Sequence, residues 1–208
     1  NRPGSPVIYL NTYSDERQKI YEAVQATGCP PFTLVTVSNL AWNHDMAPWD
    51  SPAAFKKGEP FIGGADNYLQ LLVEEIIPRA EKELAEPPVW RGIAGYSLAG
   101  LFALYAIYRT DVFSRVGCMS GSLWFPGFKE YIFSHEPKRR PDCIYFSLGD
   151  KEAKTRNSVL KTVQENTEEI QAFYQSKGID TVFQLNPGNH FVQGIERTIA
   201  GIQWLLRR

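Results

Sequence analysis

The sequence is poor in cysteine, has no long apolar run and carries no excess of charge of either sign. Its three cysteines are an odd number and include no CxxC pair, which excludes a framework in which every cysteine is paired. No apolar stretch reaches the length of a membrane span, and residues 1–10 lack the pattern of a signal peptide. The 22 basic and 23 acidic residues leave a net charge of −1, which indicates neither a nucleic-acid partner nor a membrane surface. We expect a cytoplasmic protein and leave its oligomeric state open.

Two common kinds of binding site are also missing. No spacing of His, Cys, Asp or Glu matches a metal site. The pair Gly63–Gly64 is followed by neither Lys-Ser nor Lys-Thr, so it does not form a phosphate loop of that type. The sequence therefore predicts a protein that uses no metal and no cofactor.

What the sequence does contain is a series of short apolar runs. The chain has 208 residues, 43% of them apolar, which is enough for one domain, residues 1–208, with its own core. Several runs are apolar nearly throughout, as is typical of strands buried on both faces of a parallel sheet. The six predicted strands are 7–10, 32–38, 90–96, 115–120, 143–149 and 181–187.

Helical patterns alternate with these runs. We expect Ser14 to cap the first helix, Pro78 to kink or divide the second, and the third to be buried all round. Val159 and Val192 begin the apolar stripes of the last two. The alternation predicts the α/β class, with a mostly parallel sheet of about six strands flanked by helices on both faces. The five predicted helices are 14–28, 65–84, 99–109, 157–178 and 192–208.

Two long connections interrupt the alternation. Residues 39–65 are rich in Pro, Gly and Trp, and residues 121–142 form a second long segment that we expect to be irregular. Loops of this length in a compact domain are usually functional or mobile. In an open α/β sheet they would follow the carboxyl ends of strands, where ligands bind.

Ser97 lies between the third predicted strand and the buried helix, in "IAGYSLAGLFALY". A strand–serine–helix turn of the form G-x-S-x-G holds a nucleophilic serine in a strained conformation, so its neighbours must be small. Here those neighbours are Gly95 and Ala99, the latter a departure from the usual glycine. The N–H of Leu98, at the helix N-terminus, is suited to be one donor of an oxyanion hole. Ser97 is therefore the predicted nucleophile.

A nucleophilic serine needs a base. Of the three histidines, His190 follows the last predicted strand and so reaches the same sheet edge as Ser97. His44 lies in the first long loop and is better suited to the substrate pocket, and His135 lies beside a charged surface turn. We predict His190 as the base.

The base needs an orienting acid, which in this order of residues follows the fifth strand. The segment "LGDKEAK" offers Asp150 and Glu152. We favour Glu152 because its longer side chain reaches further, with Asp150 or a Ser–His pair without an acid as alternatives.

The remaining site residues are predicted from position. Thr12 or Tyr13, after the first strand, would donate a second backbone N–H to the oxyanion. The long loops would supply the substrate-binding residues, although these aromatic residues could equally pack the loops onto the body. The substrate-binding candidates are Trp42, His44, Asp45, Trp49, Trp124 and Phe125.

Taken together, the motifs resemble a known family. The segments "IAGYSLAGLFALY", "MSGSLWF", "LGDKE", "GNHF", "WNHDMAPW" and "GGADNYLQLLVEEIIPRAE" occur in the right order over most of the chain. They resemble the "putative esterase" branch of the α/β-hydrolase fold, which includes esterase-D-type enzymes, feruloyl esterases and siderophore esterases. The family often has further strands ahead of the first one seen here.

The resemblance implies a hydrolase that cleaves small-molecule carboxylic esters through a Ser–acid–His triad and an acyl-enzyme. It also implies Glu152 as the acid, since the family commonly places it three residues after the glycine that ends the strand. An acyltransferase of the same fold and a catalytically silent binding domain are the alternatives.

Overall fold

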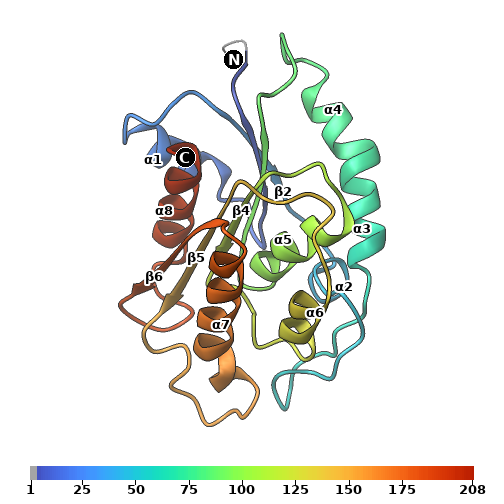
Figure 1. Cartoon of the computed structure of the whole chain (residues 1–208), viewed down its shortest axis with the longest axis vertical. Coiled ribbons are helices and arrows are strands. Elements are labelled where there is room, and N and C mark those ends of the chain that lie inside the picture. The colour runs from blue at the N-terminus through green and yellow to red at the C-terminus, as the bar shows by residue number, and fades with distance from the viewer. Residues whose placement is uncertain (1–3) are drawn as a thin grey trace.

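A single six-stranded sheet forms the centre of the molecule. The computed structural model describes residues 4–208 (Figure 1). The strand order is β2-β1-β3-β4-β5-β6, and all five neighbouring pairs are parallel. The strands are β1 (Val7–Asn11), β2 (Thr33–Val37), β3 (Arg91–Tyr96), β4 (Arg115–Met119), β5 (Cys143–Gly149) and β6 (Asp180–Asn186).

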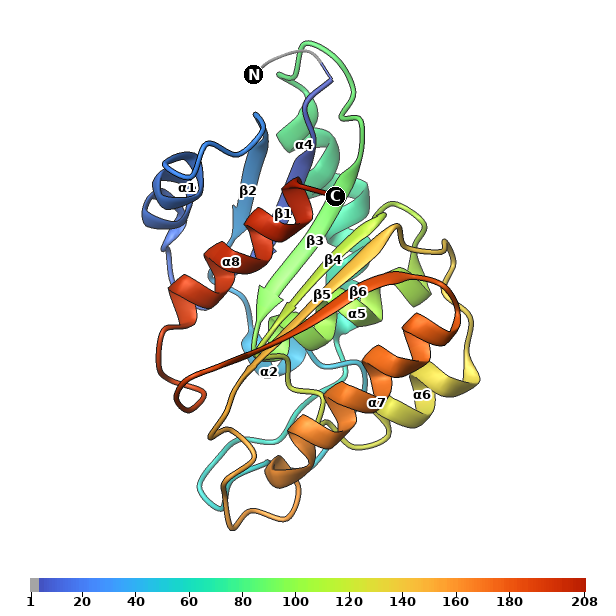
Figure 2. The same ribbon diagram turned by 60° about the vertical axis from the view of Figure 1, so that its left-hand side comes forward.

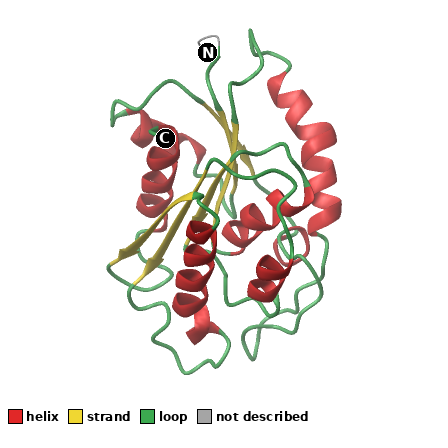
Figure 3. Cartoon of the chain, viewed as in Figure 1, coloured by secondary structure: helices red, strands yellow, loops and turns green. Residues whose placement is uncertain are grey.

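Helices cover both faces of this sheet (Figures 2 and 3). One face is covered by α1 (Arg17–Gln25) and α8 (Gly194–Leu206), whose apolar residues pack with Ile8 and Leu10 of β1. The other face is covered by the segments that follow β2, β3, β4 and β5. They are α2 (Trp42–Asp45), α3 (Ala65–Leu71), α4 (Ile77–Glu81), α5 (Leu98–Arg109), α6 (Phe128–Ser134) and α7 (Val163–Ser176).

The predicted strands and the buried helix are confirmed. Each of the six strands lies within one or two residues of its predicted range. The four inner strands are almost entirely buried, whereas the edge strands β2 and β6 are partly exposed, which agrees with the runs of apolar residues. Every residue of α5 from Leu98 to Tyr108 is buried. No helix among residues 4–208 combines the length and apolar character needed to cross a membrane.

The predicted interruption at Pro78 takes the form of a π-helical turn within a continuous run of helix. A π-helical turn, Leu72–Ile76, separates α3 from α4, and Pro78 is in the first turn of α4. Proline has no N–H to donate and its ring clashes with the preceding turn of an α-helix, and a π turn is one way for a helix to widen there. The apolar stripe still faces the core, with Leu69, Leu72 and Ile77 buried.

Several helix ends differ from the prediction because side chains and turns start them later. Ser14 does not cap α1, since the helix begins at Arg17 and Glu16 occupies the cap position. Val159 is exposed and precedes α7, because the Asn157 carboxamide accepts the N–H of Val159 and starts a 3₁₀ turn there. Val192 is exposed as well, because Gln193 has a left-handed backbone conformation that delays α8 to Gly194.

The segment 121–142 is more regular than predicted. It contains α6, which is only seven residues long and begins after Gly127, whose φ is +80°. Phe128 and Ile132, one turn apart, are buried against the core. A helix of two turns gives too short a periodic pattern to distinguish from a loop in the sequence.

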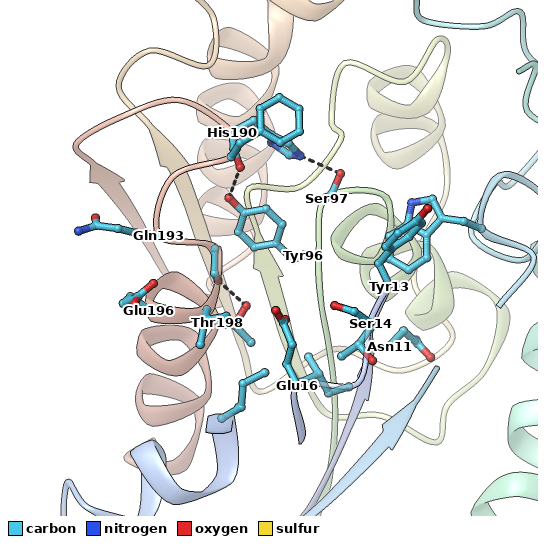
Figure 4. A pocket seen from close by; sticks show the side chains of 17 residues that line it. Asn11, Tyr13, Ser14, Glu16, Tyr96, Ser97, His190, Gln193, Glu196 and Thr198 are labelled. Atoms are coloured by element: carbon cyan, nitrogen blue, oxygen red, sulfur yellow. Dashed lines mark hydrogen bonds between the residues drawn. The ribbon is translucent and has the colours of Figure 1, made fainter. Parts of the chain in front are cut away.

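β1 lies beside β3 in the middle of the strand order. The chain adds β2 on the outer side of β1, and β4, β5 and β6 on the outer side of β3. Such a switch point leaves a crevice at the carboxyl ends of the two central strands. Residues after β1 and β3 therefore meet there, at the edge where Tyr13 and Ser97 lie (Figure 4).

Candidate active site

Ser97 occupies a strained turn between β3 and α5. Its φ of 61° and ψ of −125° are rarely adopted by a residue with a side chain, at a cost of about 1–3 kcal/mol. The turn is held because the N–H of Ser97 donates to Met119 O at 3.0 Å, and its own carbonyl accepts the N–H of Ser122 at 3.0 Å. The chain thus adopts the strained strand–serine–helix turn that the sequence predicts at Ser97.

Gly95 explains why Ala99 is acceptable in this turn. A Cβ at Gly95 would lie 2.4 Å from the backbone carbonyl carbon of Ala99 and 2.5 Å from its Cβ, closer than real atoms approach. The turn therefore needs glycine at position 95. The space beside Gly95 is filled by the backbone and the methyl group of Ala99.

His190 lies within hydrogen-bond distance of Ser97 and of Glu152. Its Nε2 is 2.9 Å from Ser97 Oγ (Figure 4), and its Nδ1 is 2.8 Å from Glu152 Oε2. Ser97 follows β3, Glu152 lies in the turn after β5, and His190 lies between β6 and α8. Three separate strand ends thus bring a hydroxyl, an imidazole and a carboxyl group into one hydrogen-bonded series.

Glu152 is buried and charged. Its side chain is only 4% exposed, and burial acts to raise the pKa of the carboxyl group. The hydrogen bond and charge of His190 and the bonds from the Gly149 N–H and the Ser120 hydroxyl outweigh burial, so the pKa of Glu152 lies below its ordinary value. The group is therefore a carboxylate at neutral pH, as a partner of imidazole must be.

Asp150, the alternative acid, has a different partner. Its Oδ1 accepts the N–H of Gly188 at 2.8 Å, and its own N–H donates to Asn186 O at 2.7 Å. Asp150 therefore fastens the start of the turn that carries His190, while Glu152 meets the imidazole.

Arg197 of α8 is a central residue of the site and is not among the site residues predicted from the sequence. Its side chain is 1% exposed and donates five hydrogen bonds between 2.9 and 3.2 Å. One nitrogen, Nη1, reaches Glu152 Oε1, Ser120 Oγ and Tyr96 Oη, and the other, Nη2, reaches the carbonyls of Pro187 and Asn189. One buried cation thus holds the carboxylate and the turn of the histidine together.

A signal for Arg197 was present in the sequence. Arg197, Gly201 and Leu205 recur every four residues on α8, and all three are buried. A charged residue on a buried stripe is rarely tolerated without a partner. This spacing could have indicated a buried ion pair, although not which carboxylate forms it.

Of the three residues predicted to donate a backbone N–H to an oxyanion, Leu98 and Tyr13 remain candidates. Leu98 is the first residue of α5, so its N–H has no acceptor within the helix. Thr12 is less suitable than predicted, because its N–H donates to Val37 O at 2.9 Å. Tyr13 is the remaining candidate of the pair, and its ring, 79% exposed, packs edge-on against Trp42 at 5.3 Å.

Two clefts meet at Ser97 and His190. We name them the first cleft, of about 540 Å³, and the second cleft, of about 400 Å³. Tyr13 and Trp42 line the first cleft, which Figure 4 shows, and Trp124 lines the second. Phe191, next to His190 and 88% exposed, lies at the edge of both.

The other predicted substrate-binding residues do not line either cleft. The His44 ring covers Gly64 and lies 2.8 Å from Asp45 Oδ1, while Asp45 Oδ2 accepts the N–H of Ala41. Trp49 packs on Phe125 with ring centres 5.8 Å apart. Its Nε1 donates to Pro126 O at 3.0 Å. His135 stacks on Tyr131 at the surface. These side chains fix the long loops in place.

The fold and the family together define the class. The architecture is that of the α/β-hydrolase enzymes, and the chain is an ester hydrolase of that class. The sequence profile described as "Putative esterase" matches residues 11–201, so the chain belongs to this family. The resemblance seen in the sequence motifs is confirmed.

Similar proteins support the same fold. The Uncharacterized protein YbbA of Bacillus subtilis (strain 168) is 23% identical over 97% of this chain and 86% of its own length. An IroE-like serine hydrolase from Shewanella oneidensis has a TM-score of 0.82 at 20% identity, covering 99% of this chain and 71% of its own. The siderophore hydrolase EstA from Aspergillus nidulans has a TM-score of 0.73 at 18% identity, covering 99% and 83%.

Proposed function

We propose that this esterase works through Ser97, His190 and Glu152 and forms an acyl-enzyme. The observation that carries the proposal is the unbroken series of contacts, 2.9 Å from Ser97 Oγ to His190 Nε2 and 2.8 Å from His190 Nδ1 to Glu152 Oε2. The series has the order and the distances that a serine nucleophile, its base and an orienting acid need.

The reaction proceeds in two halves. Ser97 Oγ attacks the carbonyl carbon of the ester while His190 Nε2 takes the hydroxyl proton. The carbonyl oxygen becomes an oxyanion, which accepts hydrogen bonds from the N–H groups of Leu98 and Tyr13. The C–O bond of the ester then breaks, and His190 returns the proton to the departing alcohol. Water then enters and attacks the acyl carbon while His190 takes one of its protons. The bond from the acyl carbon to Ser97 Oγ breaks, His190 returns that proton to Ser97 Oγ, and the carboxylic acid leaves.

Glu152 and Arg197 prepare the imidazole for these steps. The Glu152 carboxylate accepts a hydrogen bond from the Nδ1–H of His190, which leaves Nε2 free as the base, and it stabilises the imidazolium that forms. Arg197 is a positioning residue, because it touches Glu152 and the histidine turn but neither Ser97 nor the clefts. Trp42 and Trp124 bind substrate in the first and second cleft respectively.

Covalent labelling tests the proposal. A fluorophosphonate probe should modify the native protein at Ser97 alone, as located by mass spectrometry of peptides, and the heat-unfolded protein should stay unlabelled. Ser97→Ala should abolish labelling and lower kcat on an aryl acetate by at least about 10⁴-fold. Ser176→Ala, at an exposed serine at the end of α7, is the control and should be labelled as the parent is. Labelling elsewhere, or activity that survives Ser97→Ala, would contradict the assignment.

A further inference from the structure

The two clefts that meet at Ser97 carry opposite charge. The second cleft is lined by Lys151 and Lys154, and its one carboxylate, Glu152, is already paired with Arg197 and His190. The first cleft is lined by Glu16 and Glu196 and by no lysine or arginine. A chain with a net charge of −1 thus places two unmatched cations on one side of the nucleophile and two carboxylates on the other.

The lysines of the second cleft are held by the same turn as the proposed acid. The N–H of Lys151 donates to Gly188 O at 3.0 Å, and the N–H of Lys154 donates to Lys151 O at 3.2 Å. Between them, Glu152 is fixed by its own side chain. These bonds fix the backbone of Lys151 and Lys154 relative to the turn that carries His190. The long side chains of both lysines reach into solvent.

No carboxylate of the described residues neutralises these two lysines. The ion pairs of residues 4–208 include neither Lys151 nor Lys154. Asp150, which directly precedes Lys151, turns its carboxylate to the Gly188 N–H and does not line the cleft. An anionic group that enters the second cleft would therefore meet two free ammonium groups.

We propose that the preferred substrates are esters that carry an anionic group on one side of the scissile bond, bound in the second cleft by Lys151 and Lys154. This inference rests on the proposed function, since it concerns the substrate of the same site. An exposed ammonium–carboxylate contact contributes about 0.2–1 kcal/mol, which corresponds to at most roughly fivefold in kcat/KM for each lysine. The other side of the ester lies in the first cleft, where the carboxylates of Glu16 and Glu196 repel a second anion.

Two matched pairs of esters test which side carries the charge. The first pair is phenyl hydrogen adipate and phenyl methyl adipate, which differ in a carboxylate at the end of the acyl chain. The second pair is 4-carboxyphenyl butyrate and 4-carbamoylphenyl butyrate, which differ in a carboxylate on the departing phenol. Each kcat/KM is divided by the rate of alkaline hydrolysis of the same ester, so that only recognition is compared.

We expect the anionic ester of one pair, and not of the other, to be favoured over its neutral partner by roughly three- to tenfold at low salt. The advantage should fall to about one in the variant Lys151→Met/Lys154→Met. It should fall likewise near 1 M salt, where the Debye length is about 3 Å. The pair that responds identifies the group, acyl or alcohol, that occupies the second cleft.

Two controls separate local recognition from the overall charge. Lys161→Met removes an exposed lysine that lies just beyond the second cleft and does not line it. Glu83→Gln changes the charge by one unit at an exposed residue that lines neither cleft. If either variant alters the anionic preference as much as the lysine variants do, the preference belongs to the whole protein and the inference is wrong.

The outcomes distinguish this inference from the proposed function. If neither anionic ester is favoured, or if the preference survives in the double variant, the second cleft is not an anion site, even while the neutral esters are still cleaved through Ser97. If no ester is cleaved and the fluorophosphonate probe does not label Ser97, the proposed function itself fails.

Discussion

The two sides of the proposed site are built from different parts of the chain. The proton-transfer side consists of Ser97, His190 and Glu152, and side chains hold it in place: Arg197 binds Glu152, and the Tyr96 hydroxyl donates to His190 O at 2.7 Å. The proposed oxyanion side consists of the main-chain N–H groups of Tyr13 and Leu98.

This difference decides how each side can be changed. A single substitution can remove a side-chain partner from the proton-transfer side. The oxyanion side tolerates almost any side chain, because its donors belong to the main chain, and only a residue that lacks an N–H removes one of them. Four substitutions, three of them with a matched comparison variant, test this contrast, from the largest expected effect on activity to the smallest.

Glu152→Gln should lower kcat by about 10³- to 10⁴-fold, because an amide cannot stabilise the imidazolium and can hold the wrong tautomer of His190. Asp150→Asn should cost no more than about tenfold, since Asp150 contacts only backbone near the histidine turn. The measurement is kcat on an aryl acetate for both variants. A larger loss in Asp150→Asn than in Glu152→Gln would exchange their roles.

The stability of Glu152→Gln has to be measured alongside its activity. The substitution leaves Arg197 buried without its carboxylate, which can cost about 3–5 kcal/mol. Thermal unfolding followed by circular dichroism should therefore be measured for both variants, and their kinetics compared at a temperature at which both are folded.

Tyr13→Pro should lower kcat by about 10²- to 10³-fold, because it removes one N–H donor to the oxyanion. Tyr13→Ala keeps that N–H and should lower kcat only a few-fold, with most of its effect on KM through the lost contact with Trp42. Steady-state kinetics of both variants measure the contrast. Equal losses would show that the ring, and not the backbone, is what matters at this position.

Arg197→Met should lower kcat/KM by about 10- to 100-fold, the usual range for a residue that supports a site without touching the substrate. It should also move the acid limb of the kcat/KM profile to higher pH. Without the guanidinium cation, the Glu152 carboxylate loses a charged hydrogen-bond donor, so the pKa of Glu152 rises and the carboxylate that orients His190 is protonated at a less acidic pH.

Arg115→Met is the matched control for Arg197→Met. The Arg115 guanidinium also anchors α8, through a 2.6 Å bond to Leu205 O, but it does not touch Glu152. It should lower the melting temperature and leave the pH profile in place. A shift of the acid limb in both variants would assign the effect to loosening of α8.

Ala99→Gly should have the smallest effect on activity, within about threefold in kcat, since it leaves the N–H groups at the start of α5 unchanged. Loss of a buried methyl group and of helix propensity should cost about 1–2 kcal/mol of unfolding free energy. Chemical denaturation and kinetics of the same preparation measure both quantities. A large fall in kcat at full stability would mean that the side chain shapes the oxyanion side after all.

Much of the fold could be predicted because its strands are buried on both faces. The inner strands read as apolar runs, and Ser97 stands out because a strand and an apolar helix flank it. His190 and Glu152 could be predicted from their places after β6 and β5, where parallel strands end at the same edge.

Other parts depend on packing that a linear pattern does not contain. Trp49 and Trp42 look alike in the sequence, yet Trp49 packs on Phe125 while Trp42 lines a cleft. Thr12 and Tyr13 differ as candidate oxyanion donors because the N–H of Thr12 already donates to Val37 O. Arg197 could not be assigned to the site from the sequence, because only the tertiary fold brings α8 close enough for its guanidinium to pair with Glu152.

The position of Arg197 on α8 has a consequence for local unfolding. This helix rests on α1 and on the sheet, and it carries the cation that pairs with the buried Glu152 carboxylate. If α8 detaches while the rest of the molecule stays folded, Glu152 loses Arg197 and the histidine turn loses two of its carbonyl ties in the same event. The free energy of that opening, which hydrogen exchange of the α8 amides would report, then limits the fraction of molecules that are competent for catalysis at any moment.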